Sequence, residues 1–362
     1  MQFLPRWLQP LAEDWQDLAG QLPAHPAQEP PAQPPETAVE RRIAEEPVSL
    51  ENLWYVRRHP QQHRENMRLD SLEEAVSEVS RAKRAGVDAV VDVTPKHIGG
   101  DPEGVRAVAR ETGLTYVHGT AYYLQSAHPP GIADRSVEDL ADEFSSDIRT
   151  GIGETDVRAG LVGEIGLSDT IYPDEEKVLR AGARAACRTG APLMVHPPGR
   201  TPTAQRGRTY PSSRWGLDIL DIVAEEGLPA DRVVICHMDR TLYEQLEYQE
   251  ELADRGAYIE YDLWGTELYH EEYDDGYLAD AQRIDAVMHL IEEGFADRLL
   301  FSHDVCLKLQ RTAYGGFGYA HLPENVLPML RGRGVDSDVL TQITVENPAR
   351  LLTFGEPEPA SA

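Results

Sequence analysis

Residues 192–198 read Pro-Leu-Met-Val-His-Pro-Pro, a short apolar run that ends in a histidine. Residues 232–239 repeat this pattern as Arg-Val-Val-Ile-Cys-His-Met-Asp. Brief β-branched and aliphatic runs of this kind are typical of strands buried on both faces of a parallel sheet. Stretches with helical periodicity separate the runs, so the sequence predicts repeated βα units.

The same pattern extends outward over most of the chain after Gly86. No glycine-rich phosphate loop follows an early strand, and polar residues recur where the runs end, which favours a closed barrel over an open doubly wound sheet. We therefore expect an α/β fold, a (β/α)8 TIM barrel, with an eighth strand, the first in the chain, near residues 8–15. The seven apolar runs span residues 89–93, 115–117, 160–165, 192–195, 232–235, 257–261 and 298–301, and the clearest helical stretches span 175–189, 213–226 and 281–293.

The length of 362 residues fits one barrel of about 250 residues with insertions. Residues 21–36 are rich in Pro, Ala and Gln, a composition that favours an extended loop. We expect an N-terminal segment over 1–46, a barrel domain over 47–355 and a tail over 356–362.

Composition excludes several classes of protein. The 62 acidic residues outnumber 34 Lys and Arg, and the net charge of −28 repels nucleic acid and anionic membranes. Three widely spaced cysteines argue against a disulfide framework. There is no apolar run of about 18 residues, and charged residues interrupt residues 1–15, so we expect a cytoplasmic protein without a membrane span or secretory leader.

Four apolar runs end in a side chain that can bind metal: Glu164, His196, His237 and Asp304. Each residue alone has an ordinary structural explanation, such as a salt bridge to Arg for Glu164, a hydrogen-bonded core histidine, or a helix cap for Asp304. Together, two imidazoles and two carboxylates at the strand ends of one barrel indicate a site for Zn²⁺, Mn²⁺ or Co²⁺. Such an ion lowers the pKa of bound water to about 7, and Asp304 could orient that water and accept its proton.

These motifs resemble those of the phosphotriesterase-related proteins of the amidohydrolase superfamily, over about residues 47–354. The resemblance implies a barrel hydrolase that acts on small molecules, such as esters, lactones, amides or phosphoesters, and dimers are usual in that family. The matching segments are Val-Gly-Glu-Ile-Gly at 162–166, His-Pro at 196–197, Cys-His-Met-Asp-Arg-Thr at 236–241, Tyr-Asp-Leu-Trp-Gly-Thr-Glu at 261–267 and His-Asp at 303–304, with further matches at 51–54, 314–319 and 346–348.

By this resemblance, Glu164 bridges two metals, as in the glutamate branch of the family, His196 and His237 bind the more exposed metal, and Asp304 binds the buried one. The family also places a His-x-His pair on the first strand, and this sequence has none; Leu-Gln-Pro-Leu stands at 8–11. Three explanations of this departure remain open. The amino terminus is altered, the chain uses a single metal on Glu164, His196 and His237, or catalysis has been lost. We expect one or two divalent metals, zinc first.

Three further residues lie where they could contact a substrate: Tyr123 after the run at 115–117, Arg240 beyond His237, and Trp264 after the run at 257–261. An aromatic ring could line the pocket, although packing beneath helices would explain Tyr123 and Trp264 equally. Arg240 could bind an anionic group, but a structural salt bridge is the better-supported explanation in so acidic a chain. The leading interpretation is a metal-dependent hydrolase, and the alternative is a catalytically silent barrel that binds a small molecule. No nucleic-acid or membrane partner is expected, and a homodimer is possible.

Overall fold

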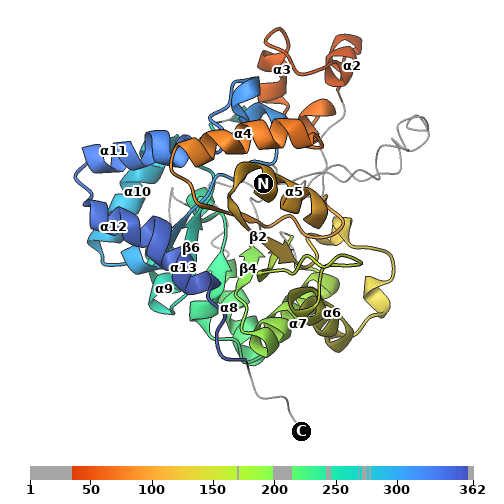
Figure 1. Cartoon of the computed structure of the whole chain (residues 1–362), viewed down its shortest axis with the longest axis vertical. Helices are drawn as coiled ribbons and strands as arrows, with labels where there is room; N and C mark the ends of the chain where they lie inside the picture. The colour runs from red at the N-terminus through yellow and green to blue at the C-terminus, as the bar shows by residue number, and fades with distance from the viewer. Residues whose placement is uncertain are drawn as a thin grey trace.

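The computed structural model describes residues 35–168, 171–198, 214–241, 246–267, 269–270, 275–276 and 279–357. Seven parallel strands form its centre, paired in the order β1-β2-β3-β4-β5-β6-β9. Figure 1 shows them surrounded by helices, with the N-terminal helices α2 and α3 at the outside of the molecule. The strands are β1 Ala89–Asp92, β2 Thr115–Thr120, β3 Leu161–Gly166, β4 Leu193–His196, β5 Val233–Ile235, β6 Tyr258–Tyr261 and β9 Leu299–Phe301.

The seven strands predicted from the apolar runs are all confirmed. The central strands β3, β5 and β6 are buried at every position, as expected for strands covered on both faces. The outermost strand β1 is buried only at Asp92. The first strand that we expect near residues 8–15 lies outside the described part of the chain.

The helices connect successive strands and cover the outside of the sheet. α7 packs on β3 and against α6. The predicted helices at 175–189, 213–226 and 281–293 correspond to α7, α8 and α10. The helices are α2 Ala38–Glu45, α3 Leu53–Arg58, α4 Leu72–Arg84, α5 Pro102–Thr112, α6 Val137–Arg149, α7 Pro173–Thr189, α8 Trp215–Glu225, α9 Leu246–Asp254, α10 Asp280–Glu292, α11 Leu327–Gly332, α12 Ser337–Thr341 and α13 Asn347–Leu352.

Side chains that cap the helices explain several of these starting points. Ser71 accepts a hydrogen bond from the Glu74 amide at the start of α4, and Ser136 forms a reciprocal capping box with Asp139 at the start of α6. Each cap satisfies backbone donors that a helix leaves unpaired at its first turn.

The alternating pattern of each strand divides the interior into two faces. Val233 and Ile235 belong to the large core between the sheet and the helices, whereas Val234 and Cys236 pack with Tyr258 on the opposite, inner face. A short antiparallel pair, β7 Tyr269–His270 and β8 Asp275–Gly276, follows β6. None of the described helices is long and apolar enough to cross a membrane. Because the seven strands are parallel, their carboxyl ends meet at one end of the barrel, and this is where the polar residues gather.

Candidate metal centre

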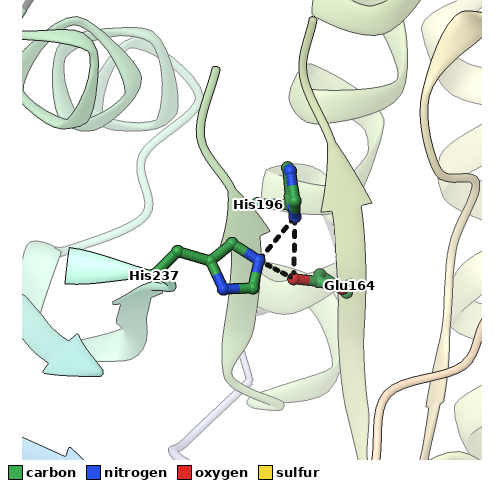
Figure 2. Close-up of side chains that lie close together, drawn as sticks. All are labelled: Glu164, His196 and His237. Atoms are coloured by element: carbon green, nitrogen blue, oxygen red, sulfur yellow. Dashed lines mark hydrogen bonds and ion pairs between the residues drawn. The ribbon is translucent and has the colours of Figure 1, made fainter. Parts of the chain in front are cut away.

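Three of the four predicted ligands converge at the carboxyl ends of neighbouring strands. Oε1 of Glu164, in β3, lies 3.3 Å from Nδ1 of His196 and 3.3 Å from Nε2 of His237. The two ring nitrogens lie 2.6 Å apart. Figure 2 shows the three side chains pointing at one another. All three residues are buried.

The local shape of β3 brings Glu164 to this position. The register between β3 and β4 shifts between Val162 and Ile165, so Glu164 lies in an irregular stretch of the strand, and such irregularities re-aim side chains. Gly163 has φ of 145°, and a Cβ atom there would lie 2.6 Å from the carbonyl oxygen of Met194. Only glycine allows this approach of β3 to β4.

His237 is oriented by Asp262, which follows β6. Nδ1 of His237 lies 2.8 Å from Oδ1 of Asp262, and the backbone N–H of His237 donates to Oδ2 at 3.1 Å. These contacts hold His237 at φ of 56°, in the left-handed region. Non-glycine residues in this region cost roughly 1–3 kcal/mol and cluster at functional sites. A carboxylate on the far nitrogen is the usual arrangement for a metal-binding histidine.

The charges of the three residues depend on one another. Burial raises the pKa of Glu164, but hydrogen bonds and charges from His196 and His237 outweigh it and hold that pKa well below its usual range. Burial and the charge of His237 lower the pKa of His196 to about 4. Burial and Arg240 also lower the pKa of His237, but Asp262 and Glu164 outweigh them and raise it to about 10.

The donor set fits a divalent cation. Nδ1 of His196 faces Glu164, His237 and the hydroxyl of Tyr123, the last at 2.9 Å. One ring nitrogen carries a single proton or a single lone pair, so it cannot satisfy three polar neighbours. A cation at the centre would accept lone pairs from both imidazoles and the carboxylate. Zinc–nitrogen bonds of about 2.0–2.1 Å place two such nitrogens about 3–3.5 Å apart, so the rings would need to separate by less than about 1 Å.

Asp304 lies near these three residues but is not part of their group. Within the described ranges, the donor atoms of Glu164, His196 and His237 lie within 4.8 Å of one another, and Asp304 is not in that set. Its half-buried side chain follows β9, and its backbone has φ of 44°. Burial and the charges of Asp262 and Glu164 raise the pKa of Asp304 to about 6, despite the opposing charge of His237.

The three predicted substrate contacts have different surroundings. Tyr123 is buried and reaches His196 through its hydroxyl. Arg240 follows His237 in the short helix Met238–Thr241, and its charge lowers the pKa values of Tyr123, His237 and Asp304, which places it beside the site. Trp264 is buried in the large core, with its ring centre 5.3 Å from that of Phe301, and this position favours a packing role. A substrate contact for each stays a prediction.

Sequence reasoning missed the residues that hold the histidine loops in place. Arg283 of α10 is 1% exposed and donates from Nε to Asp239 at 2.8 Å and from Nη1 to Asp280 at 3.0 Å. Asp239 also accepts a hydrogen bond from the Leu263 amide. Arg283 thus ties the loop after β5 to α10, and Asp239 ties that loop to the loop after β6. Asp262 could have been predicted from the sequence, because it directly follows the apolar run at 257–261. No local pattern in the sequence of α10 distinguishes Arg283 from an ordinary helical residue.

Known proteins resemble this chain over most of its length. The model of the Phosphotriesterase family matches residues 35–352. The N-acetyltaurine hydrolase of Homo sapiens is 36% identical over 323 residues, which cover 88% of this chain and 89% of that protein. The N-acetyltaurine hydrolase of Danio rerio is 34% identical over 311 residues, 85% of each chain.

Two solved structures are also similar. A resiniferatoxin-binding protein from Rhodobacter sphaeroides has 38% identity and a TM-score of 0.82, covering 88% of this chain and 86% of that one. The phosphotriesterase homology protein from Escherichia coli, complexed with phosphate in its active site, has 30% identity and a TM-score of 0.69, covering 80% and 92%. The predicted resemblance and the predicted TIM-barrel fold are both confirmed, and this chain belongs to the phosphotriesterase family.

Proposed function

We propose that this chain is a metal-dependent hydrolase that cleaves the amide bond of a small N-acylated amine carrying an anionic group. The observation that carries the proposal is the convergence of Glu164, His196 and His237, with Asp262 on the far nitrogen of His237. Among the reactions expected from the sequence, the name of the relatives, N-acetyltaurine hydrolase, favours amide cleavage.

Glu164, His196 and His237 would hold a divalent cation, and Asp304 is the candidate for a further ligand. Imidazole and carboxylate donors suit zinc, which is our first choice, as well as manganese and cobalt. A bound cation of this type polarises a carbonyl group and lowers the pKa of water. One or two ions for each chain are compatible with this donor set.

The chain's own residues supply the proton transfers. Asp304 would take a proton from the attacking water and return it to the amine nitrogen as the carbon–nitrogen bond breaks. Tyr123 would hold the ring of His196 through its hydroxyl, which lies 2.9 Å from Nδ1. Burial raises the pKa of Tyr123 well above its usual range, so this hydroxyl keeps its proton.

Arg240 would bind the anionic group of the substrate. Its charge already acts on Tyr123, His196 and Asp304, so an anion beside it would lie close to the reacting amide. A guanidinium group pairs with carboxylate or sulfonate oxygens through two parallel hydrogen bonds. The otherwise strongly acidic chain would repel an anionic substrate elsewhere.

The direct test is an activity screen with the metal content measured on the same samples. Purified protein would be assayed with N-acetyltaurine, uncharged N-acyl amines, lactones and aryl phosphotriesters, before and after removal of metal by a chelator. We expect amide hydrolysis that disappears with the metal and returns when zinc is added. Arg240→Gln should raise KM for N-acetyltaurine about 10- to 100-fold and leave uncharged amides unaffected. Turnover that survives complete metal removal would overturn the proposal.

The alternative is a barrel that binds a small molecule without catalysis. The resiniferatoxin-binding relative and the absence of His-x-His from this sequence favour it. Metal analysis distinguishes the two: about one or two equivalents of zinc or manganese per chain support the enzyme, and a metal-free protein that binds ligands supports the alternative.

A further inference from the structure

A second group of donor atoms lies next to the first, on the inner face of the barrel. Cys236, Glu260 and Asp262 each offer one ligand atom, and these atoms lie within 4.8 Å of one another. The three residues are 0%, 7% and 4% exposed. This group shares no member with Glu164, His196 and His237.

The strand register explains why these side chains meet. Val234 pairs with Tyr258, and Ile235 pairs with Ile259. Continuing the register by one residue places Cys236 beside Glu260. Glu260 and Asp262 are two residues apart, so they project from the same side of β6 and its extension.

The surroundings of Glu260 make the group costly without a cation. Oε2 of Glu260 is buried and has no hydrogen-bond partner. No ion pair to Lys or Arg is found for Glu260 or Asp262 in the described part of the chain. Cys236 packs among Val234, Tyr258 and Leu300, so its environment is apolar. Asp262 has His237 as a charged partner, but Glu260 has none among the described residues, and burying that second carboxylate beside the first is unfavourable.

We propose that Cys236, Glu260 and Asp262 form a second binding site for a divalent cation of the zinc and cobalt type. One thiolate and two carboxylates select such ions over magnesium and calcium, which prefer oxygen donors alone. Zinc–sulfur bonds of about 2.3 Å and zinc–oxygen bonds of about 2.0–2.2 Å place the donors about 3–4 Å apart, within reach of small side-chain rotations. Binding releases the thiol proton of Cys236, and any proton on Glu260, to solvent.

Asp262 connects this inner site to the first one. The same carboxylate holds Nδ1 and the backbone N–H of His237. A cation at the inner site would draw electron density from Asp262 and change the orientation and basicity of His237. The two sites are therefore coupled, although each has its own donors.

Cobalt titration of the full-length protein tests this site through its sulfur ligand. After metal removal, Co²⁺ would be added while the near-ultraviolet absorption is recorded, because a thiolate bound to Co²⁺ gives a charge-transfer band there and nitrogen or oxygen ligands do not. We expect a band that saturates and that falls to the cobalt-free baseline in Cys236→Ala. His196→Ala should keep the band, because it removes no donor of the Cys236 group.

The other two cysteines supply matched controls. Cys187→Ala and Cys306→Ala should both keep the band, since neither residue belongs to the group. Glu260→Gln is a second test that remains available if Cys236→Ala does not fold. It removes a ligand while preserving the side-chain shape, and it should weaken cobalt binding at least tenfold. The proposal is overturned if the protein saturated with cobalt shows no band. It is also overturned if the band persists in Cys236→Ala or is lost only in Cys306→Ala. So would unchanged cobalt binding in Glu260→Gln.

Discussion

The imidazole of His237 and the carboxylate of Asp262 form a two-point contact, with Nδ1 at 2.8 Å from Oδ1 and the backbone N–H donating to Oδ2 at 3.1 Å. The contact keeps a proton on Nδ1 and directs Nε2 towards Glu164. It also holds the backbone of His237 in its left-handed conformation. One carboxylate thus sets the ring direction and the backbone of a candidate ligand.

Replacing Asp262 by alanine should therefore weaken metal binding. Loss of such a partner to a metal-binding histidine typically costs 10- to 100-fold in affinity. The dissociation constant for zinc, measured by competition with a chelator, should rise by this factor. Asp285→Ala, at a residue whose side chain is 65% exposed, is the control and should leave it unchanged. Equal affinities in the two variants would show that Asp262 does not orient His237.

Replacing Asp304 by asparagine should separate catalysis from metal binding. The amide preserves the shape of the side chain but cannot accept a proton from water. We expect most of the metal to remain and kcat to fall about 10²- to 10⁴-fold. Metal content and steady-state kinetics on one preparation measure both effects. Full activity in this variant would remove Asp304 as the base. For comparison, the alanine variants of the three converging residues should each lower metal content: Glu164→Ala, His196→Ala and His237→Ala.

Arg283→Met should destabilise the whole protein. The guanidinium group is 1% exposed and pairs with Asp239 and Asp280, so the substitution leaves the buried Asp239 without its cation and Asp280 with His321 alone. Breaking a buried pair in this way costs about 3–5 kcal/mol. Urea unfolding would measure the change in the free energy of unfolding. Arg333→Met, in an exposed pair with Asp285, should cost less than about 1 kcal/mol. A loss of similar size in both variants would contradict the structural role of Arg283.

The network around Glu143 should make stability depend on pH. Burial raises the pKa of Glu143, but Lys96 at 2.6 Å, Arg135 and Tyr122 outweigh it and lower that pKa below its ordinary value of 4.5. A depressed folded-state pKa stabilises the protein above the unfolded-state value, and this stabilisation is lost as pH falls through the folded-state value. At neutral pH, Glu143→Gln should lower the free energy of unfolding by about 2 kcal/mol.

Below pH 4.5 this difference between the wild-type protein and Glu143→Gln should shrink, because the wild-type carboxylate itself becomes protonated. Urea unfolding of both proteins across the acid range would measure it. A difference that stays constant or grows on acidification would show that Glu143 is not held in its charged form by these partners.

Local sequence patterns were sufficient to predict the strands and the main helices. The run that became β5 is aliphatic at each position because both of its faces are covered, and the helical stretch that became α7 begins at a proline and ends before Gly190. The same reasoning located the polar residues at the strand ends. It could not distinguish which of them meet, because that depends on strand order and on the irregular register around Glu164.

By itself, the sequence determined a parallel α/β barrel, a strongly acidic chain, and four candidate ligands at strand ends. Hydrophobic periodicity and residue chemistry are local properties, so they can be read along the chain. Only the tertiary structure brought Glu164, His196 and His237 together, left Asp304 beside them but outside their group, and placed Asp262 and Arg283 behind the histidine loops. Those relationships join residues that are distant in sequence, and packing of the whole barrel decides which side chains share a space.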